Sequence, residues 1–350
     1  MKTMSKTPDK MPDNVTDRPL VTFALFAYNQ EGFIREAVEG AFAQTYEPLE
    51  IILSDDCSSD RTFEIMEEMA AAYEGPHVVH CRQNPRNIGV LSHVLSVMHE
   101  IGGSLVVVAA GDDISLPHRS AELTRVWKET GGWGFFSSFD SIDSDGLTIA
   151  ENVFSRGNGE IMNWFAPLGS SSFLHGATSA YDARLFEFIP RVDNRTMAED
   201  GLFFGLLKLL DRQIICVPLP LVAYRQHSGA IANNTVNFAP SFNVIRDQEL
   251  KIRDFAATYV QIADLLESIA ENNPEMQVRF EQVQDGIREA SKRFAVRRDW
   301  VEMSVFAKLR LAISSEKPEI RTFIASRIFG LYAFCFIKSL YCRTHSLLFR

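Results

Sequence analysis

Among the adjacent acidic residues in the first 230 positions of the chain, three pairs contain aspartate: Asp55-Asp56, Asp112-Asp113 and Glu199-Asp200. The first two follow directly on apolar runs, 49–54 and 105–111, which are typical of buried strands. Neighbouring carboxylates repel each other unless a cation or hydrogen-bond donors pair them. A divalent cation bound to a phosphate-bearing ligand would pair them, so the pattern favours an active site that handles phosphate.

The elements that must position the first two pairs follow an alternating pattern. Between residues 20 and 110, short apolar runs alternate with stretches whose apolar residues recur at helical spacing, as in parallel α/β layers. We expect strands at 21–27, 49–55, 78–81 and 105–111, and helices at 34–44, 62–73 and 90–100. Ser58 or Ser59 is the expected N-cap of the second helix. Ligands of open α/β sheets bind beyond the carboxyl ends of the strands, so both aspartate pairs should border one cleft.

The third acidic pair lies in a region of different character. From Gly132 to Pro190 the sequence is aromatic and rich in Ser and Gly, which predicts mixed sheet and loops. Glu199-Asp200 should open a helix whose buried stripe includes Leu202 and Leu206. Two short strands, 214–217 and 221–224, are expected after this helix.

Length and composition suit a globular protein with one large domain and a smaller appendage. The chain has 350 residues, of which 46% are hydrophobic and 23% are charged. Residues 1–18 are polar and contain no apolar run long enough for a signal peptide, so we expect a disordered cytosolic tail. The five cysteines are odd in number and lack C-x-x-C spacing, which predicts neither a disulfide framework nor a zinc site. A cytoplasmic location fits best.

The region after residue 234 is expected to be helical. Apolar residues alternate by three and four on both sides of Asn272-Asn273-Pro274, which predicts a helical hairpin over 240–312. Its seams could pack on the preceding domain or, through 245–300, on a second copy of the chain. A homo-oligomer is therefore one expected arrangement.

The C-terminal segment is basic. Residues 291–350 carry twelve Lys and Arg against four Asp and Glu, whereas the whole chain has a net charge of −10. We expect a basic amphipathic helix over 313–350. Its apolar run 328–337 falls short of the roughly 20 residues that cross a bilayer. Segment 320–350 could contact the inner face of the cytoplasmic membrane peripherally, or it could dock into a core or dimer seam.

Six short segments stand in order across the first 231 residues. They are Phe26-Ala27-Tyr28-Asn29-Gln30-Glu31, Gln44-Thr45-Tyr46 with the run 49–60, Asn87-Ile88-Gly89, Gly111-Asp112-Asp113 with Pro117, Glu199-Asp200, and Tyr224-Arg225-Gln226-His227. In this order they resemble the family 2 glycosyltransferases, which use nucleotide sugars and have the GT-A fold. The resemblance implies an α/β, Rossmann-like nucleotide-sugar-binding domain over 19–234 with a C-terminal helical extension.

The resemblance also implies which residues bind the donor. Asp56 would accept a hydrogen bond from the nucleotide base, commonly the ring N–H of uracil, so a UDP-sugar is favoured; Asp55 would support it. Arg225 would neutralise phosphate charge. The remaining donor-binding residues would be Phe26, Tyr28 and Asn29 in the wall of the base pocket, Asn87, and Asp112 at the ribose. A loop or helix-capping role is the alternative, for Asp55 and for Asp60.

A divalent cation, Mn²⁺ or Mg²⁺, is implied as cofactor. Asp113 would be its main ligand, with Asp112 beside it and His227 near the metal or the diphosphate. Many relatives carry another Asp at the position of Ala110, so a cage of three carboxylates is not expected. The alternative for His227 is an ordinary surface residue or a donor to a ligand.

Glu199-Asp200 stands where the family carries its catalytic base. In an inverting transfer the acceptor hydroxyl must lose a proton as it attacks the anomeric carbon, which requires a carboxylate on that face. By position Asp200 would be the base, and Glu199 would hold the acceptor or neighbouring groups. The alternative is favourable charge at a helix N-terminus.

The function implied is metal-dependent, inverting transfer of a sugar from a nucleotide diphosphate sugar to a hydroxyl of a saccharide or lipid-linked acceptor, in the synthesis of cell-surface polysaccharide or glycan. Nucleic acid is not an expected partner. A sugar-phosphate nucleotidyltransferase would need a Gly-rich triphosphate loop, whereas the first strand here runs into Phe26-Ala27-Tyr28-Asn29-Gln30. A non-catalytic scaffold of a polysaccharide-making complex is the other alternative, which the presence of Asp113 and Asp200 disfavours.

Overall fold

The computed structural model describes residues 18–153, 176–190, 199–227, 260–282, 284–285, 306–307 and 310. Its elements, in chain order, are β1 (Val21–Ala27), α1 (Ile34–Phe42), β2 (Leu49–Asp55), α2 (Thr62–Ala71), β3 (Val78–Gln83), α3 (Val90–Met98), β4 (Leu105–Ala110), β5 (Ile114–Ser115), α4 (Arg119–Thr130), β6 (Gly134–Ile142), β7 (Thr148–Val153), η2 (Gly176–Thr178), β8 (Ser179–Asp182), η3 (Ala183–Phe188), α5 (Glu199–Leu209) and β9 (Ile214–Arg225). The strands and helices predicted before residue 111 are confirmed, with helix ends one or two residues earlier than expected.

All the strands belong to one mixed sheet. Their order is β3-β2-β1-β4-β8-β6-β9-β5, and β7 pairs with β6 beside this path. Strands β3, β2, β1 and β4 are parallel, and Ala27 pairs with Asp55 while Phe26 pairs with Ala110. The carboxyl ends of β1, β2 and β4 therefore lie level at one edge of the sheet. Strand β8 is antiparallel to both β4 and β6, which joins the parallel half to the second half.

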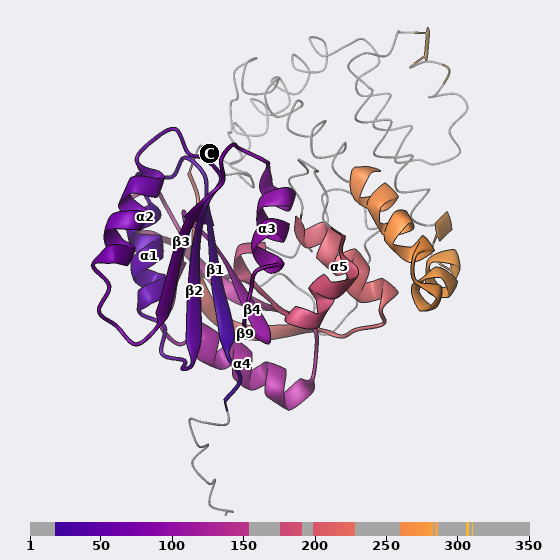
Figure 1. The fold of residues 1–350 in the computed structure, drawn as a ribbon, viewed down its shortest axis with the longest axis horizontal. Helices are drawn as coiled ribbons and strands as arrows, with labels where there is room; N and C mark the ends of the chain where they lie inside the picture. The colour runs from indigo at the N-terminus through magenta and orange to yellow at the C-terminus, as the bar shows by residue number, and fades with distance from the viewer. Residues whose placement is uncertain are drawn as a thin grey trace, which may run out of the picture.

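Helices cover both faces of the sheet (Figure 1). One apolar layer packs α1, α2 and α4 against the side chains of Val21, Phe23 and Leu25. The other packs α3, α5 and helical residues of 260–280 against Ala24 and Val106. The alternation of neighbouring β1 residues between the two layers follows from the two-residue period of a strand. Because both faces are covered, the parallel strands β1, β2 and β4 are largely buried, whereas the edge strand β3 is partly exposed.

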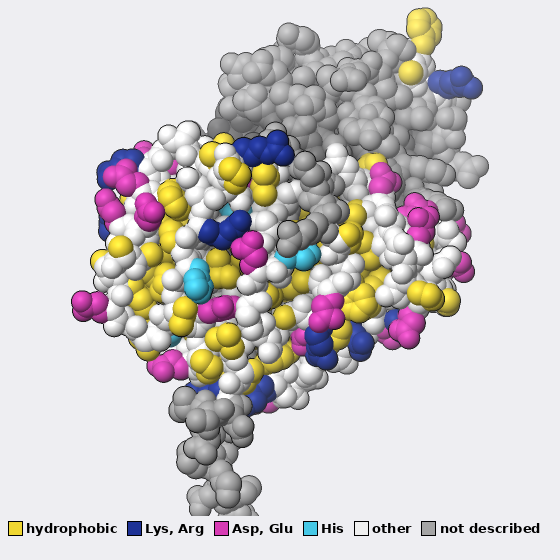
Figure 2. Space-filling model, in the orientation of Figure 1, with side chains coloured by type: hydrophobic (Ala, Val, Ile, Leu, Met, Phe, Trp, Pro, Cys, Tyr) yellow, Lys and Arg dark blue, Asp and Glu magenta, His cyan; other side chains and the backbone are white. Residues whose placement is uncertain are grey.

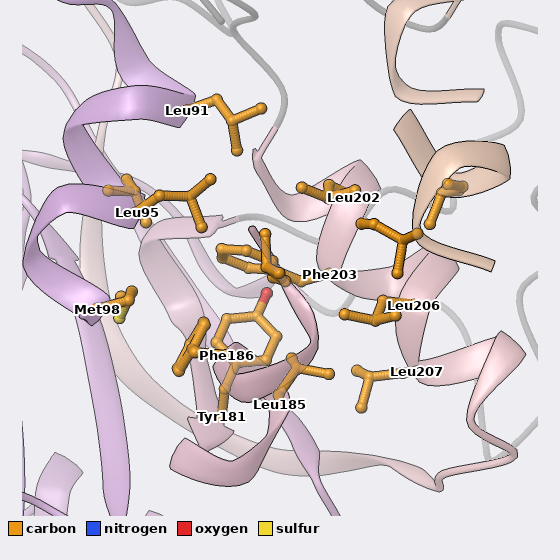
Figure 3. Packing of buried hydrophobic residues seen from close by; sticks show 14 of the residues in the cluster. Leu91, Leu95, Met98, Tyr181, Leu185, Phe186, Leu202, Phe203, Leu206 and Leu207 are labelled. Carbon is orange, nitrogen blue, oxygen red and sulfur yellow. The ribbon is translucent and has the colours of Figure 1, made fainter. Parts of the chain in front are cut away.

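The second layer has an aromatic centre (Figure 3). Tyr181, Phe186 and Phe203 pack edge to face, with ring centroids 5.0 to 6.2 Å apart. Edge-to-face pairs add to the free energy gained from burying these large side chains. Leu95 and Met98 of α3 close the cluster on one side and Leu206 of α5 closes it on the other. This cluster fixes α5, and with it the third acidic pair, against the sheet.

Strand β9 corrects one prediction. Two short strands were expected at 214–217 and 221–224, whereas the structure has a single strand of 12 residues. Its pairing with β6 shifts between Val217 and Pro220, where Ser137 and Ser138 are the β6 partners. Proline cannot donate a hydrogen bond to a ladder, so Pro218 and Pro220 are accommodated in a bulge that does not end the strand.

Helix α2 corrects a second prediction, because neither Ser58 nor Ser59 caps it. The backbone N–H of Thr62, the first residue of the helix, donates to Asp60 Oδ1 over 3.0 Å. Asp60 also accepts from the backbone N–H of Glu31 over 3.1 Å. The hydroxyl of Ser58 instead donates to Asp55.

Gln44 joins α1 to the segment that follows the second aspartate pair. Its buried amide Nε2 donates to the carbonyl oxygens of Gly40 and Leu116 over 2.9 and 3.0 Å. Its Oε1 accepts from the backbone N–H and the hydroxyl of Ser120 over 2.9 and 2.8 Å. The Gln-Thr-Tyr segment therefore fixes the start of α4 and the chain that leads to it from Asp113.

Replacing Gln44 with leucine is expected to lower the free energy of unfolding by about 3 kcal/mol, because buried partners lose their hydrogen bonds while the volume is nearly kept. Urea unfolding at pH 7 measures this change. The matched control is Gln284→Leu, whose amide donates to Glu281 at an exposed position and should cost less than about 0.5 kcal/mol. A loss below 1 kcal/mol for Gln44→Leu would contradict the structural role.

The predicted helical hairpin lies only partly within the described residues. Residues 260–271 and 274–282 are helical, and the break falls at Asn272-Asn273 as predicted. Asn273 Oδ1 accepts from the backbone N–H of Glu275 over 3.2 Å, which caps the helix that begins at Pro274. Segments 1–17 and 313–350, and most of 240–312, lie outside the described residues. Among the helices that the structure describes, none has the length and apolar character needed to cross a bilayer.

Candidate active site

Asp55 organises the loop that follows β2. Its buried carboxylate accepts from the backbone N–H of Ser58 over 2.8 Å, from the hydroxyl of Ser58, and from the amide of Gln83 over 2.9 Å. These donors come from the loop and from β3, so the carboxylate needs no cation to offset its charge. The loop role that we left open for Asp55 is therefore the one its hydrogen bonds favour.

Asp56 lies at the N-terminus of α3. Its Oδ1 accepts from the amide of Asn84 over 2.8 Å and from the backbone N–H of Ile88 over 3.0 Å, and its Oδ2 accepts from the backbone N–H of Gly89 over 2.9 Å. A carboxylate offers about four acceptor positions, so Oδ2 has capacity for one further N–H. The structure also places Asn87 in this turn, directly before the two donors.

The predicted base-pocket residues follow β1 at the same edge. Tyr28 is 46% exposed, and Asn29 has a positive φ of 53°. Asn29 Oδ1 accepts from the backbone N–H of Ser59 over 2.8 Å, which ties the β1 loop to the β2 loop. Phe26 is half-buried and packs edge to face on His93, with ring centroids 5.1 Å apart. Tyr28 is therefore the aromatic side chain of this group that a base can reach.

Ser54, Arg82 and His93 form a hydrogen-bond network behind this pocket. His93 Nε2 lies 2.7 Å from the hydroxyl of Ser54, and Arg82 donates to the same hydroxyl over 3.0 Å. Since Arg82 donates to it, the hydroxyl can give its own proton to His93. Burial lowers the pKa of His93 to about 4, against the opposing effect of Asp56. Arg82 brings a cation to this corner from β3, where sequence patterns gave no signal, and also donates to Asn84 over 3.1 Å.

The neutral His93 gives stability a defined pH dependence. Its folded pKa of about 4 lies below the usual 6.5, so between these values the unfolded chain binds a proton that the folded protein does not. Stability should fall as the pH drops through this window, by about 2 kcal/mol between pH 7 and pH 5. Urea unfolding of His93→Gln should lack this part of the loss. His80→Gln on the exposed side of β3 is the matched control, and equal losses in wild type and His93→Gln would refute the prediction.

The second aspartate pair forms the turn between β4 and β5. Asp113 is 6% exposed and its Oδ1 accepts from the backbone N–H of Arg225 over 2.8 Å. Burial and the neighbouring charge of Asp112 raise the pKa of Asp113 well above its usual value. Asp112 Oδ2 lies 3.0 Å from His227 Nε2. The structure thus pairs two of the predicted metal ligands, Asp112 and His227, and places Asp113 beside them in the same turn.

Arg225 has a different place from the one expected. Its guanidinium donates to the carbonyl oxygens of Asp112, Asp143 and Ser144 over 3.0 to 3.2 Å, and to Glu36 Oε2 over 2.8 Å. The side chain is 1% exposed and lies over the ring of Phe33. Its hydrogen bonds hold the aspartate turn to α1 and to the β6–β7 turn. In this conformation the guanidinium faces protein groups, and phosphate contact by Arg225 stays a prediction.

The residues around Asp113 fit a hard divalent cation that also binds a diphosphate. Their donor atoms are carboxylate oxygens and one imidazole nitrogen, and the raised pKa of Asp113 shows a charge that lacks compensation. Within the described ranges, no group of three or more His, Cys, Asp and Glu side chains is arranged to hold an ion by itself. Magnesium and manganese sites often use one or two carboxylates and complete their shell with phosphate oxygens and water.

Glu199 and Asp200 begin α5. Burial raises the pKa of Asp200 to about 6, and burial together with the charge of Asp200 raises that of Glu199 to about 8. At neutral pH one carboxyl is therefore ionised and its neighbour is largely protonated. Gly176 packs against them: a Cβ added at that position would lie 2.5 Å from Glu199 Oε1. The absence of a side chain at Gly176 leaves the space that Glu199 occupies.

Tyr224 connects the second and third acidic pairs. This half-buried residue of β9 has a raised pKa, chiefly because of burial and then because of the charges of Asp113, Asp112 and Asp200. The two pairs are therefore close enough to act on one side chain. The carboxyl edge of the sheet thus has polar side chains after β1 and β2 and an acidic turn after β4, and α5 begins with a carboxyl pair whose pKa values differ. These features are those expected of an α/β enzyme that binds a phosphate-bearing ligand and moves a proton.

Comparisons with known proteins agree with this class. Residues 22–189 match the sequence profile of glycosyl transferase family 2. An uncharacterised glycosyltransferase of Rickettsia typhi is 41% identical over 248 residues, which cover 67% of this chain and 73% of that protein. The crystal structure of S. aureus TarS in complex with UDP-GlcNAc has a TM-score of 0.51 and 16% identity, covering 93% of this chain and 92% of that one. The chain belongs to glycosyl transferase family 2 and has the GT-A fold.

Other relatives match over shorter stretches. Uncharacterised proteins of Mycobacterium bovis and Mycobacterium tuberculosis are 40% identical over 88 residues. The chain spans about a quarter of the length of these curated relatives. They therefore carry no information on family or substrate.

Proposed function

We propose that this protein is an inverting, metal-dependent glycosyltransferase. It would transfer a sugar from a nucleoside diphosphate donor, with a UDP-sugar favoured, to a hydroxyl of a saccharide or lipid-linked acceptor in cell-surface polysaccharide or glycan synthesis. The observation that carries the proposal is the match to glycosyl transferase family 2. The Asp112-Asp113 turn and Asp200 both lie near enough to Tyr224 for their charges to raise its pKa, which supports a shared site. Donor-side and base-side carboxylates then border one cleft, as a single displacement at the anomeric carbon requires.

Asp200 supplies the base in this proposal. Its pKa of about 6 leaves it ionised at neutral pH and near the value that favours proton transfer. The acceptor oxygen attacks the anomeric carbon and gives its proton to Asp200, while the bond from that carbon to the diphosphate oxygen breaks. Glu199, protonated at neutral pH, can donate a hydrogen bond to the acceptor. A cation held by Asp113, Asp112 and His227 would offset the charge of the leaving diphosphate.

The residues that follow β1 and β2 support a nucleotide donor. Asp56 Oδ2 has capacity for one ring N–H, and Tyr28 offers an exposed aromatic face beside it. Uracil and guanine both carry a ring N–H, so this chemistry alone does not choose the base. The UDP preference rests on the family resemblance.

Thermal unfolding with a panel of nucleotides tests the proposal. UDP, GDP, CMP and their sugar conjugates are each added with and without Mn²⁺, because a ligand at many times its dissociation constant raises the unfolding temperature. One nucleoside diphosphate should stabilise the protein, and more strongly with the metal. Release of a nucleoside diphosphate from the matching donor sugar supports transfer, whereas formation of pyrophosphate from a nucleoside triphosphate would favour a nucleotidyltransferase. Lack of binding across the panel would favour the scaffold.

A further inference from the structure

Arg119 is a buried cation with no role in the proposed chemistry. It is the first residue of α4 and is 0% exposed. One terminal nitrogen donates to the carbonyl oxygens of Val108, Ala177 and Ser179 over 2.6, 2.8 and 3.3 Å. The other donates to the hydroxyl of Ser115 over 2.8 Å. The guanidinium therefore joins β4, β5 and the segment from η2 to β8.

This cation is costly to bury. Taking an ion out of water costs several kcal/mol in a real protein, and a carboxylate partner often repays part of it. The hydrogen-bond partners of Arg119 in the described residues are neutral, and its Nε has none. Burial lowers its pKa to about 9, so it is still charged at neutral pH, and the charge of Asp113 opposes that shift. An apolar side chain of similar volume would avoid this cost in free energy. A charged guanidinium at this position therefore indicates a role that an apolar side chain could not fill.

The contacts of Arg119 lead to both sides of the cleft. Val108 belongs to β4, the strand that ends in the Asp112-Asp113 turn. On the other side, the hydroxyl of Ser179 donates to the carbonyl oxygen of Gly176 over 2.6 Å, and Gly176 lies directly against Glu199. One rigid group thus connects the strand behind the donor site to the segment that seats the base pair.

We propose that Arg119 is a positioning residue, whose guanidinium fixes η2 against β4 and so sets the distance between the Asp112-Asp113 turn and the Glu199-Asp200 pair. The inference rests on the proposed function in assigning these pairs to donor and base. Donor binding depends on β1, β2 and β4, which Arg119 does not connect to one another. Loss of the fork should therefore slow the chemical step and leave donor affinity largely unchanged.

Arg119→Lys is the decisive variant. Lysine keeps the charge, but its compact ammonium cannot reproduce the planar fork that spans three carbonyl oxygens and a hydroxyl. The matched control is Ser115→Ala, which removes only the hydroxyl partner. Arg119→Met removes both charge and fork, and the lysine variant keeps the test valid if the methionine variant does not fold.

Two measurements decide the question. Hydrogen exchange by mass spectrometry should show at least tenfold faster exchange at residues 176–182 and 199–203 of Arg119→Lys, with β1 and β2 unchanged, while calorimetry with UDP and Mn²⁺ gives a Kd within threefold of wild type. Hydrolysis of UDP-glucose, UDP-galactose and UDP-GlcNAc should show kcat about tenfold lower with KM unchanged, and Ser115→Ala should stay within threefold.

Wild-type exchange at 176–182 and 199–203 in Arg119→Lys would overturn the inference, and so would faster exchange spread equally over β1 to β4. Weakened UDP binding with unchanged kcat would overturn it as well. Failure of the proposed function has a different signature: wild-type protein would then bind none of the nucleotides with metal, whatever the exchange data show for Arg119→Lys.

Discussion

Asp200→Asn is expected to slow sugar transfer by about three orders of magnitude, because the amide cannot accept the proton of the acceptor hydroxyl. Asparagine keeps the size of the side chain and can still accept the hydrogen bond that Asp200 Oδ1 receives from the backbone N–H of Gly201 over 2.7 Å. The loss should therefore appear in kcat, with donor affinity retained. Steady-state release of the nucleoside diphosphate measures it. Asp211→Asn, just beyond the other end of α5 with a side chain 82% exposed, is the matched control.

The same assignment predicts the pH dependence of the wild-type rate. The base acts in its ionised form, so kcat should rise with pH through about 6, where Asp200 loses its proton, and Glu199 titrates near 8 as a second step of the coupled pair. A rate that is flat from pH 5 to pH 7, or an Asp200→Asn variant with more than a tenth of wild-type activity, would remove Asp200 from the role of base.

Asp113→Asn is expected to separate ligand binding from stability. The amide oxygen can still accept from the backbone N–H of Arg225, but the charge that would hold a cation is gone. Metal-dependent binding of UDP should weaken by about a hundredfold or more, since a carboxylate ligand is lost. Calorimetry with UDP and Mn²⁺ measures this effect, and Asp145→Asn on the exposed β6–β7 turn is the control.

Without ligand, the same variant should be more stable than wild type at pH 7. Burial and Asp112 raise the pKa of Asp113, so ionisation at neutral pH works against folding, and the stability present at low pH is lost as the pH rises through the folded value. Asparagine removes that penalty. Thermal unfolding in a metal chelator should show the increase, which is typical of residues kept for function at a cost in stability. A variant that is less stable and binds UDP normally would contradict the metal-site assignment.

The spacing of apolar residues along the sequence predicted most elements of the fold. Strands β1, β2 and β4 were predictable as apolar runs and helices α1 to α3 from apolar residues at helical spacing, and the first two aspartate pairs were placed correctly at strand ends. The predictions were wrong at the ends of elements, where hydrogen bonds to other parts of the chain determine the local structure. Asp60 accepts from the first backbone N–H of α2 and also from the backbone N–H of Glu31 in the β1 loop, a contact that no pattern within the helix reveals. The bulge that keeps β9 whole depends likewise on its partner β6.

The sequence predicted the residue types of the candidate site better than it predicted their hydrogen-bond partners. Asp56 is bound by donors more than 25 positions away, and Arg225 by partners between 81 and 189 positions away. A motif gives the residue and its place along the chain, but it does not say which donors will occupy its hydrogen-bonding capacity in the fold. Arg82 and Arg119 were missed for the same reason, since each belongs to no motif and acts through contacts that only the tertiary structure creates.

The position of Arg225 at the end of β9 also implies an order in which parts of the domain fold. The strands that lead to the first two acidic pairs have been synthesised by residue 113. They pair with strands that are close to them in the sequence, since β1 pairs with β2 and with β4. The Asp112-Asp113 turn is nevertheless held to α1 and to the β6–β7 turn by Arg225, which lies more than 110 positions later in the chain. Contacts of such long range form late in folding. A nascent chain that stops short of Arg225 should therefore have a nearly complete parallel half-sheet and an unformed aspartate turn.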